Sequence, residues 1–94
     1  MSSFIAQPHF VCYSATKAAI IQMTRNMAMD LAPFGIRVNA VCPGWTDTPI
    51  LSGLKDDDPE TLQRIVARVP IQRLGRPEEV ANAVLWLCSD AASF

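Results

Sequence analysis

Hydrophobic positions follow a helical pattern over residues 12–32, the longest regular stretch of the chain. Apolar residues occupy almost every face of this predicted helix, which is typical of a helix that is covered on more than one side. We therefore expect it to pack on a sheet and also against another helix or a second subunit. Pro33 and Gly35 end the helix, because proline cannot continue it and glycine suits the left-handed conformation that follows many helices.

A short β-branched run over residues 36–42 follows at once and predicts a strand that ends before Pro43 and Gly44. A helix followed directly by a strand with few polar positions is typical of an αβ unit in a covered parallel sheet. The expected fold class is therefore α/β. In such sheets ligands bind beyond the carboxyl ends of the strands, so the polar loop at residues 43–49 is a candidate binding loop.

Two more helices are predicted after this loop. One begins at Pro59 behind a capping Asp58, ends at Pro70, and is short enough to form a lid over the loop. The other begins at Pro77 and carries two glutamates in its first turn, where the helix macrodipole favours negative charge. No repeat, low-complexity tract or linker divides the chain, which predicts that residues 1–94 belong to one domain.

The composition is that of a globular protein, with 50% hydrophobic and 18% charged residues among 94. A net charge of -1 gives no electrostatic footprint for nucleic acid or for an anionic membrane. Because no apolar run is long enough to cross a bilayer and the first residues lack the blocks of a signal peptide, we expect a soluble cytoplasmic protein. One histidine and three widely spaced cysteines predict reduced core thiols, with no disulfide frame and no metal site.

Tyr13 and Lys17 are four residues apart at the head of the first predicted helix, so their side chains fall on one face, about one turn apart. A phenol is a poor acid or base near neutrality, but a neighbouring ammonium stabilises the phenolate. Such a tyrosine can pass a proton to or from a substrate oxygen. The alternative is a half-buried ring beside a solvated amine, which is common on amphipathic helices.

The loop at residues 43–49 offers a second set of candidate residues. Gly44 allows a flat ligand to approach the backbone, and the hydroxyls of Thr46 and Thr48 can bind an amide or a phosphate. The alternative is a turn at Pro43 and Gly44 followed by a threonine cap for the next helix.

Four segments in a fixed order resemble the short-chain dehydrogenase/reductase family and together cover nearly the whole chain. They are residues 13–19 (Tyr-Ser-Ala-Thr-Lys-Ala-Ala), 35–41 (Gly-Ile-Arg-Val-Asn-Ala-Val), 43–49 (Pro-Gly through Thr-Pro), and 73–81 (Arg-Leu-Gly-Arg-Pro-Glu-Glu-Val-Ala) followed by 85–90. The resemblance implies a doubly wound, Rossmann-like parallel sheet. It also implies an oxidoreductase that uses NAD or NADP to interconvert an alcohol and a carbonyl by hydride transfer.

Carried over by position, Tyr13 resembles the catalytic acid/base, and Lys17 resembles the residue that promotes its ionisation and holds the nicotinamide ribose. The Pro43-Gly44 turn and Thr46 are similar to the wall against the nicotinamide carboxamide, with Thr48 near the carboxamide or the pyrophosphate. The helix over residues 12–32 resembles the family's subunit-contact helix, which implies a homodimer or homotetramer of the complete enzyme.

Other parts of the family's pattern have no counterpart in this sequence. The glycine-rich phosphate loop and the residue that selects NAD or NADP belong to an N-terminal half, so residues 1–94 are expected to be the C-terminal, catalytic-motif part of the domain. The family's catalytic serine falls just before Met1, which makes Ser2 and Ser3 poor candidates for it. The alternative function is that of a non-catalytic truncated fragment that associates with a full-length relative.

Overall fold

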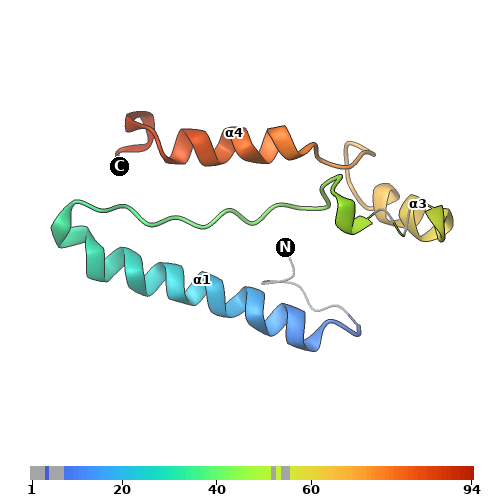
Figure 1. Cartoon of the computed structure of the whole chain (residues 1–94), viewed down its shortest axis with the longest axis horizontal. Coiled ribbons are helices and arrows are strands. Elements are labelled where there is room, and N and C mark those ends of the chain that lie inside the picture. The colour runs from blue at the N-terminus through green and yellow to red at the C-terminus, as the bar shows by residue number, and fades with distance from the viewer. Residues whose placement is uncertain (1–3, 5–7, 52, 54–55) are drawn as a thin grey trace. The chain divides into compact units, whose positions relative to one another are not determined.

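The computed structural model of the chain describes residue 4 and residues 8–51, 53 and 56–94. The chain divides into two compact units, which we treat one at a time: a first unit of Met1–Cys42 with Trp86–Phe94, and a second unit of Pro43–Leu85. Regular structure in the described residues is helical (Figure 1), with α-helices α1 (Val11–Leu31), α3 (Pro59–Ala67) and α4 (Pro77–Leu87), and single 3₁₀ turns η1 (Ala32–Phe34), η2 (Pro49–Leu51) and η3 (Asp90–Ala92).

Helix α1 forms where the hydrophobic pattern predicts it, within one residue at each end. It passes into η1, and Gly35 then adopts the left-handed conformation, with φ 71°. The Gly35 amide donates to the carbonyl of Ala32 at 2.9 Å, and the Ile36 amide donates to the carbonyl of Leu31 at 3.3 Å. These bonds satisfy carbonyls at the end of the helix, and a residue with a Cβ is strained at this φ.

The predicted packing of α1 on several sides is not found in the described part of the chain, because none of its residues is buried there. Its exposed side chains include large apolar ones, among them Met23 and Met29. The three cysteines are free but exposed, so the prediction of core positions for them is wrong. The physical reason is general: Leu51 and Ala92 are the buried hydrophobic residues of the described chain, which leaves little core for a thiol to enter.

Residues 36–42 have neither helix nor strand assigned, and Figure 1 draws them as an extended trace after α1. The predicted strand is therefore not confirmed, because a strand is defined by a ladder of hydrogen bonds to a neighbour. Within the described residues, the pairing found between extended segments is one isolated parallel bridge, between Thr46 and Gly75.

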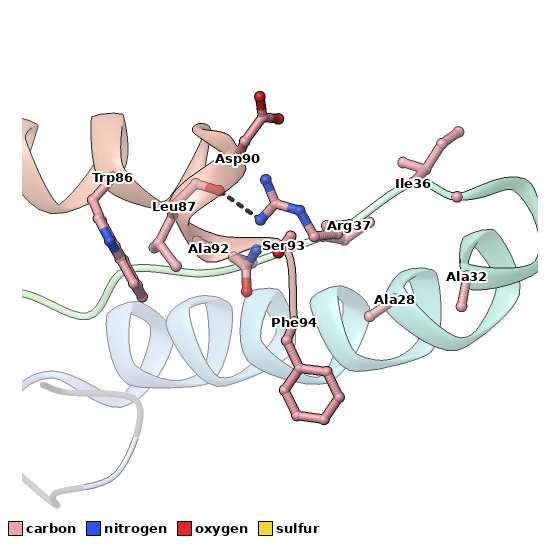
Figure 2. A pocket seen from close by; sticks show the side chains of 13 residues that line it. Ala28, Ala32, Ile36, Arg37, Trp86, Leu87, Asp90, Ala92, Ser93 and Phe94 are labelled. Atoms are coloured by element: carbon pink, nitrogen blue, oxygen red, sulfur yellow. Dashed lines mark hydrogen bonds between the residues drawn. The ribbon is translucent and has the colours of Figure 1, made fainter.

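Arg37 joins this extended segment to the end of α4 inside the first unit. Its guanidinium donates from Nη1 to the carbonyl of Leu87 at 2.6 Å and from Nη2 to the carbonyl of Ser89 at 3.1 Å. Leu87 is the last residue of α4, so the bond to its carbonyl satisfies an acceptor that has no intrahelical donor, and the cation also complements the helix dipole. Figure 2 shows this contact at the wall of a cavity of about 630 Å³, which is also lined by the end of α1 and by the C-terminal residues.

In the second unit, α3 begins as the sequence predicts. The Asp58 carboxylate accepts a hydrogen bond from the Thr61 amide at 3.1 Å. Hydrogen bonding by the Thr61 side chain, and then by this amide, lowers the pKa of Asp58. Pro59 is the first residue of the helix, where its missing N–H has no intrahelical partner to lose. The predicted role of α3 as a lid stays a prediction. Among the helices that the structure describes, none is both long and apolar enough to cross a membrane.

Candidate active site

The first two turns of α1 bring Tyr13 and Lys17 together on one face. The Lys17 Nζ lies 5.4 Å from the centroid of the Tyr13 ring, and 46% of Tyr13 is exposed. The Phe10 ring packs against the Tyr13 ring edge to face, with centroids 5.7 Å apart and an interplanar angle of 82°. This contact supports one side of the phenol and leaves part of it open to solvent.

The Lys17 ammonium has no ion pair with a carboxylate in the described part of the chain, so its charge is not neutralised by a nearby anion there. An ammonium this close to an aromatic ring is also attracted by the ring's quadrupole, which favours the observed position. Thr16, between the two residues, turns its hydroxyl back to the Tyr13 carbonyl at 2.8 Å. An accessible phenol and an accessible cation therefore share one helix face, a pair that can exchange a proton and bind hydroxyl groups.

The candidate loop lies in the second unit and is fixed by backbone hydrogen bonds. The Gly75 amide donates to the Trp45 carbonyl at 2.9 Å, and the Asp47 amide donates to the Gly75 carbonyl at 2.8 Å. These two bonds form the parallel bridge between Thr46 and Gly75. A Cβ on Gly75 would lie 3.6 Å from the Trp45 carbonyl oxygen, an ordinary van der Waals contact.

The two threonine hydroxyls of the loop donate within the loop itself. Thr46 Oγ1 donates to the Gly44 carbonyl at 3.2 Å, and Thr48 Oγ1 donates to the Thr46 carbonyl at 3.5 Å. Each oxygen keeps lone pairs that can accept from a ligand N–H. The Thr48 carbonyl accepts the Leu51 amide at 2.9 Å, and among the described residues no amide donates to the Thr48 hydroxyl, so a threonine cap is not found there. A Cβ at Gly44 would meet nothing within 4 Å, so the backbone is open to approach there.

A charged network around Glu79 lies next to the bridge along the chain. Arg73 donates to both carboxylate oxygens of Glu79, at 2.8 Å and 2.6 Å, and the Arg76 amide donates to Oε2 at 2.7 Å. The Arg73 hydrogen bonds, followed by the one from the Arg76 amide, lower the pKa of Glu79 to about 2, and Glu79 in turn raises the pKa of Arg73. The sequence places Glu79 in the first turn of a helix and in a segment that resembles the family, but it does not indicate the ion pair with Arg73.

Glu79 also has the role of the acidic residue in a capping box, since it accepts the amide of the residue that precedes α4. The sequence signal for the ion pair is Arg73, which stands six residues before Glu79, the third residue of α4. That spacing alone does not distinguish a bidentate ion pair from two solvated charges.

The six predicted site residues are divided between the two units. Tyr13 and Lys17 belong to the first, and the loop residues Pro43, Gly44, Thr46 and Thr48 belong to the second. The cavity in Figure 2 includes neither Tyr13 nor Lys17 in its lining. Ser2 and Ser3 lie outside the described residues.

A family model described as enoyl-(acyl carrier protein) reductase matches residues 1–94. The chain belongs to the short-chain dehydrogenase/reductase family. It is 47% identical over 93 residues to the short-chain dehydrogenase srdC of Neurospora crassa, covering 99% of this chain and 34% of that protein. It is 51% identical over 90 residues to the cis-4-hydroxycyclohexanecarboxylate dehydrogenase of Sinomonas cyclohexanicum, covering 96% of this chain and 35% of that protein. The chain thus spans about a third of the length of these curated relatives.

Solved structures agree with this assignment. A short-chain dehydrogenase family protein from Francisella tularensis superposes with a TM-score of 0.86 at 36% identity, covering 99% of this chain and 42% of its own. A variant of actinorhodin polyketide ketoreductase with NADPH gives a TM-score of 0.85 at 37% identity, covering 98% of this chain and 39% of its own. The chain therefore corresponds to part of a Rossmann-fold protein of this family, while its described residues hold no ladder of a parallel sheet.

We predict that Glu79 titrates far below its ordinary pKa of 4.5, at about 2, because protonation breaks its ion pair with Arg73. A lowered folded-state pKa means that the stabilisation by this carboxylate is complete above about pH 4.5 and is lost as the pH falls towards 2. Carbon-detected NMR of the side-chain carboxylate measures the midpoint. The Glu78→Gln variant should keep this low midpoint, and a midpoint near 4.5 for Glu79 in either protein contradicts the network.

Proposed function

We propose that residues 1–94 are the C-terminal, catalytic-motif part of an NAD(P)-dependent oxidoreductase that interconverts an alcohol and a carbonyl by hydride transfer. The observation that carries the proposal is the pair on α1, in which the Lys17 Nζ lies 5.4 Å from the centre of an accessible Tyr13 ring. Family membership supports it, and two related proteins are named for alcohol or carbonyl chemistry, a hydroxycyclohexanecarboxylate dehydrogenase and a polyketide ketoreductase with NADPH. The choice between NAD and NADP stays open.

In this proposal Tyr13 is the acid/base. During reduction the phenol gives its proton to the carbonyl oxygen of the substrate, and during oxidation the phenolate accepts the proton of the alcohol. Lys17 stabilises the phenolate and donates to the ribose hydroxyls of the nicotinamide half. The nicotinamide ring, when bound, supplies or accepts the hydride.

The loop at residues 43–48 has the chemistry to hold the carboxamide end of the same cofactor. Its open backbone at Gly44 admits a flat ring, and Pro43 presents an apolar surface without an amide proton. Thr46 and Thr48 have lone pairs free to accept the carboxamide N–H groups, since both hydroxyl protons bond within the loop. The donor and acceptor set therefore fits a nicotinamide.

The remaining expectations belong to the whole protein. We propose that residues 36–42 form a strand of a doubly wound parallel sheet that an N-terminal dinucleotide-binding half completes. We also propose a cytoplasmic homodimer or homotetramer that acts on a small-molecule alcohol or carbonyl, with α1 at a subunit contact. The exposed apolar side chains of α1, such as Met23 and Met29, support a covering partner for this helix.

The Tyr13→Phe substitution in the full-length protein should lower kcat by about 10²–10⁴-fold, the usual range for a lost general acid or base. The ring and its contact with Phe10 remain, so we expect an unchanged helical signal and thermal midpoint as the internal control. Steady-state oxidation of the nicotinamide, followed at its absorbance, measures the effect. An unchanged kcat removes Tyr13 from the mechanism.

The alternative function is that of a non-catalytic fragment that associates with a full-length relative. It is favoured by the small described core, in which Leu51 and Ala92 are the buried hydrophobic residues. A fragment of this kind needs no cofactor site of its own, so binding of nicotinamide nucleotides separates the two functions.

Titration with NADH and NADPH, followed by nicotinamide fluorescence, tests this point. We expect saturable binding by the full-length protein and binding at least about tenfold weaker by the 94-residue chain, because the proposed pyrophosphate site at a helix N-terminus lies in the other half. Absence of binding by both proteins, with a longer relative co-purifying with the 94-residue chain, favours the alternative.

A further inference from the structure

We infer that Glu79 is a positioning residue for the loop at residues 45–47, which it holds in place through the connector at residues 73–76. This inference rests on the proposed function, because it gives the loop its importance by placing the nicotinamide carboxamide there. Glu79 itself need not touch the cofactor. Its effect passes through the backbone of Gly75.

The first step is that Glu79 binds the connector at residues 73–76. Its two carboxylate oxygens accept both Arg73 Nη atoms and the Arg76 amide, at 2.6 to 2.8 Å, and Arg76 Nη2 lies 3.4 Å from Oε1. The Arg73 Nη1 also donates to the Leu74 carbonyl at 2.9 Å. Bidentate, charge-assisted hydrogen bonds fix geometry as well as distance. Both ends of the connector are thus bound to one carboxylate that a helix carries.

The second step is that the connector binds the loop at residues 45–47 through the backbone of Gly75. Gly75 lies between the two arginines, and it donates to Trp45 and accepts from Asp47 at 2.9 and 2.8 Å. These bonds flank Thr46, whose hydroxyl in turn bonds to Gly44. A shift of the connector therefore shifts the backbone on both sides of Thr46. Displacements of about 1 Å in positioning elements are enough to change binding and turnover strongly.

Glu78 provides a matched comparison within the same helical turn. It has the same side chain and the same first turn of the helix dipole, but its side chain makes no hydrogen bond or ion pair with the described residues. A variant at Glu78 therefore reproduces the loss of one negative charge at the start of α4 without disturbing the connector. A difference in cofactor KM or amide exchange between Glu79→Gln and Glu78→Gln therefore reports the hydrogen bonds that Glu79 makes with Arg73 and Arg76.

The test compares Glu79→Gln, Glu78→Gln, Arg73→Gln and the Arg73→Gln/Glu79→Gln double variant of the full-length protein. We expect Glu79→Gln and Arg73→Gln each to raise the KM for the nicotinamide cofactor at least about fivefold, with kcat changed less than about twofold. The double variant should be no worse than either single one, because both changes remove the same interaction. Glu78→Gln should keep the parent KM. A merely structural role lowers the amount of active protein, and hence kcat, without a selective rise in KM.

Amide hydrogen exchange gives a second measurement that needs no cofactor. In Glu79→Gln the Asp47 and Gly75 amides should exchange faster by a similar factor, while the capped Thr61 amide of α3 keeps its protection. Equal cofactor KM values for Glu79→Gln and Glu78→Gln, or unchanged exchange at Asp47 and Gly75, overturn the inference. If Tyr13→Phe abolishes turnover while these values stay equal, this inference fails and the proposed function stands. Full turnover of Tyr13→Phe contradicts the proposed function, and the exchange rates then still decide the connection from Glu79 to the loop.

Discussion

An α-helix completes a turn about every 3.6 residues, and the chemistry proposed for this chain depends on that pitch. Residues four apart necessarily share a face, and in α1 the shared face carries a phenol and an ammonium 5.4 Å from ring centre to nitrogen. The contact is local, within one helix, so it does not require any particular packing of the rest of the molecule. The Phe10 ring, which packs edge to face against the Tyr13 ring, restricts the pair further on one side.

The candidate loop at residues 43–48 depends on a different constraint. Its loop has no regular structure of its own and is positioned by partners far away along the chain, first by Gly75 and then, through the connector, by Glu79. The hydroxyls of Thr46 and Thr48 donate to carbonyls within the loop. A loop held in this way can keep open acceptors for a ligand without a large hydrophobic core beneath it.

The sequence predicts the structures that depend on local contacts, and it does not predict those that depend on distant partners. Helices α1, α3 and α4 follow from hydrophobic spacing, from the Asp58 cap and from prolines at first helical positions, because those signals act within a few residues. The β-branched run over residues 36–42 predicts a strand, but a strand needs a neighbour, and local sequence does not specify one.

The Glu79 network escaped prediction for a related reason. Its partner Arg73 lies six residues before Glu79 and outside the helix. Charge pairs are predicted from sequence when they are three or four residues apart within one helix. The Tyr13–Lys17 geometry was the most predictable part of the site, and the roles of both residues, like those of the loop, remain proposals. The resemblance to a family was therefore needed to connect a helix face with a loop that local patterns treat separately.

The most direct test of the account is a crystal structure of the full-length protein with NADH or NADPH bound. The account predicts that the Tyr13 hydroxyl and the Lys17 Nζ both lie within hydrogen-bond distance of the nicotinamide ribose, with the carboxamide against Thr46 or Thr48. A nicotinamide half that contacts neither α1 nor the loop at residues 43–48 would contradict it.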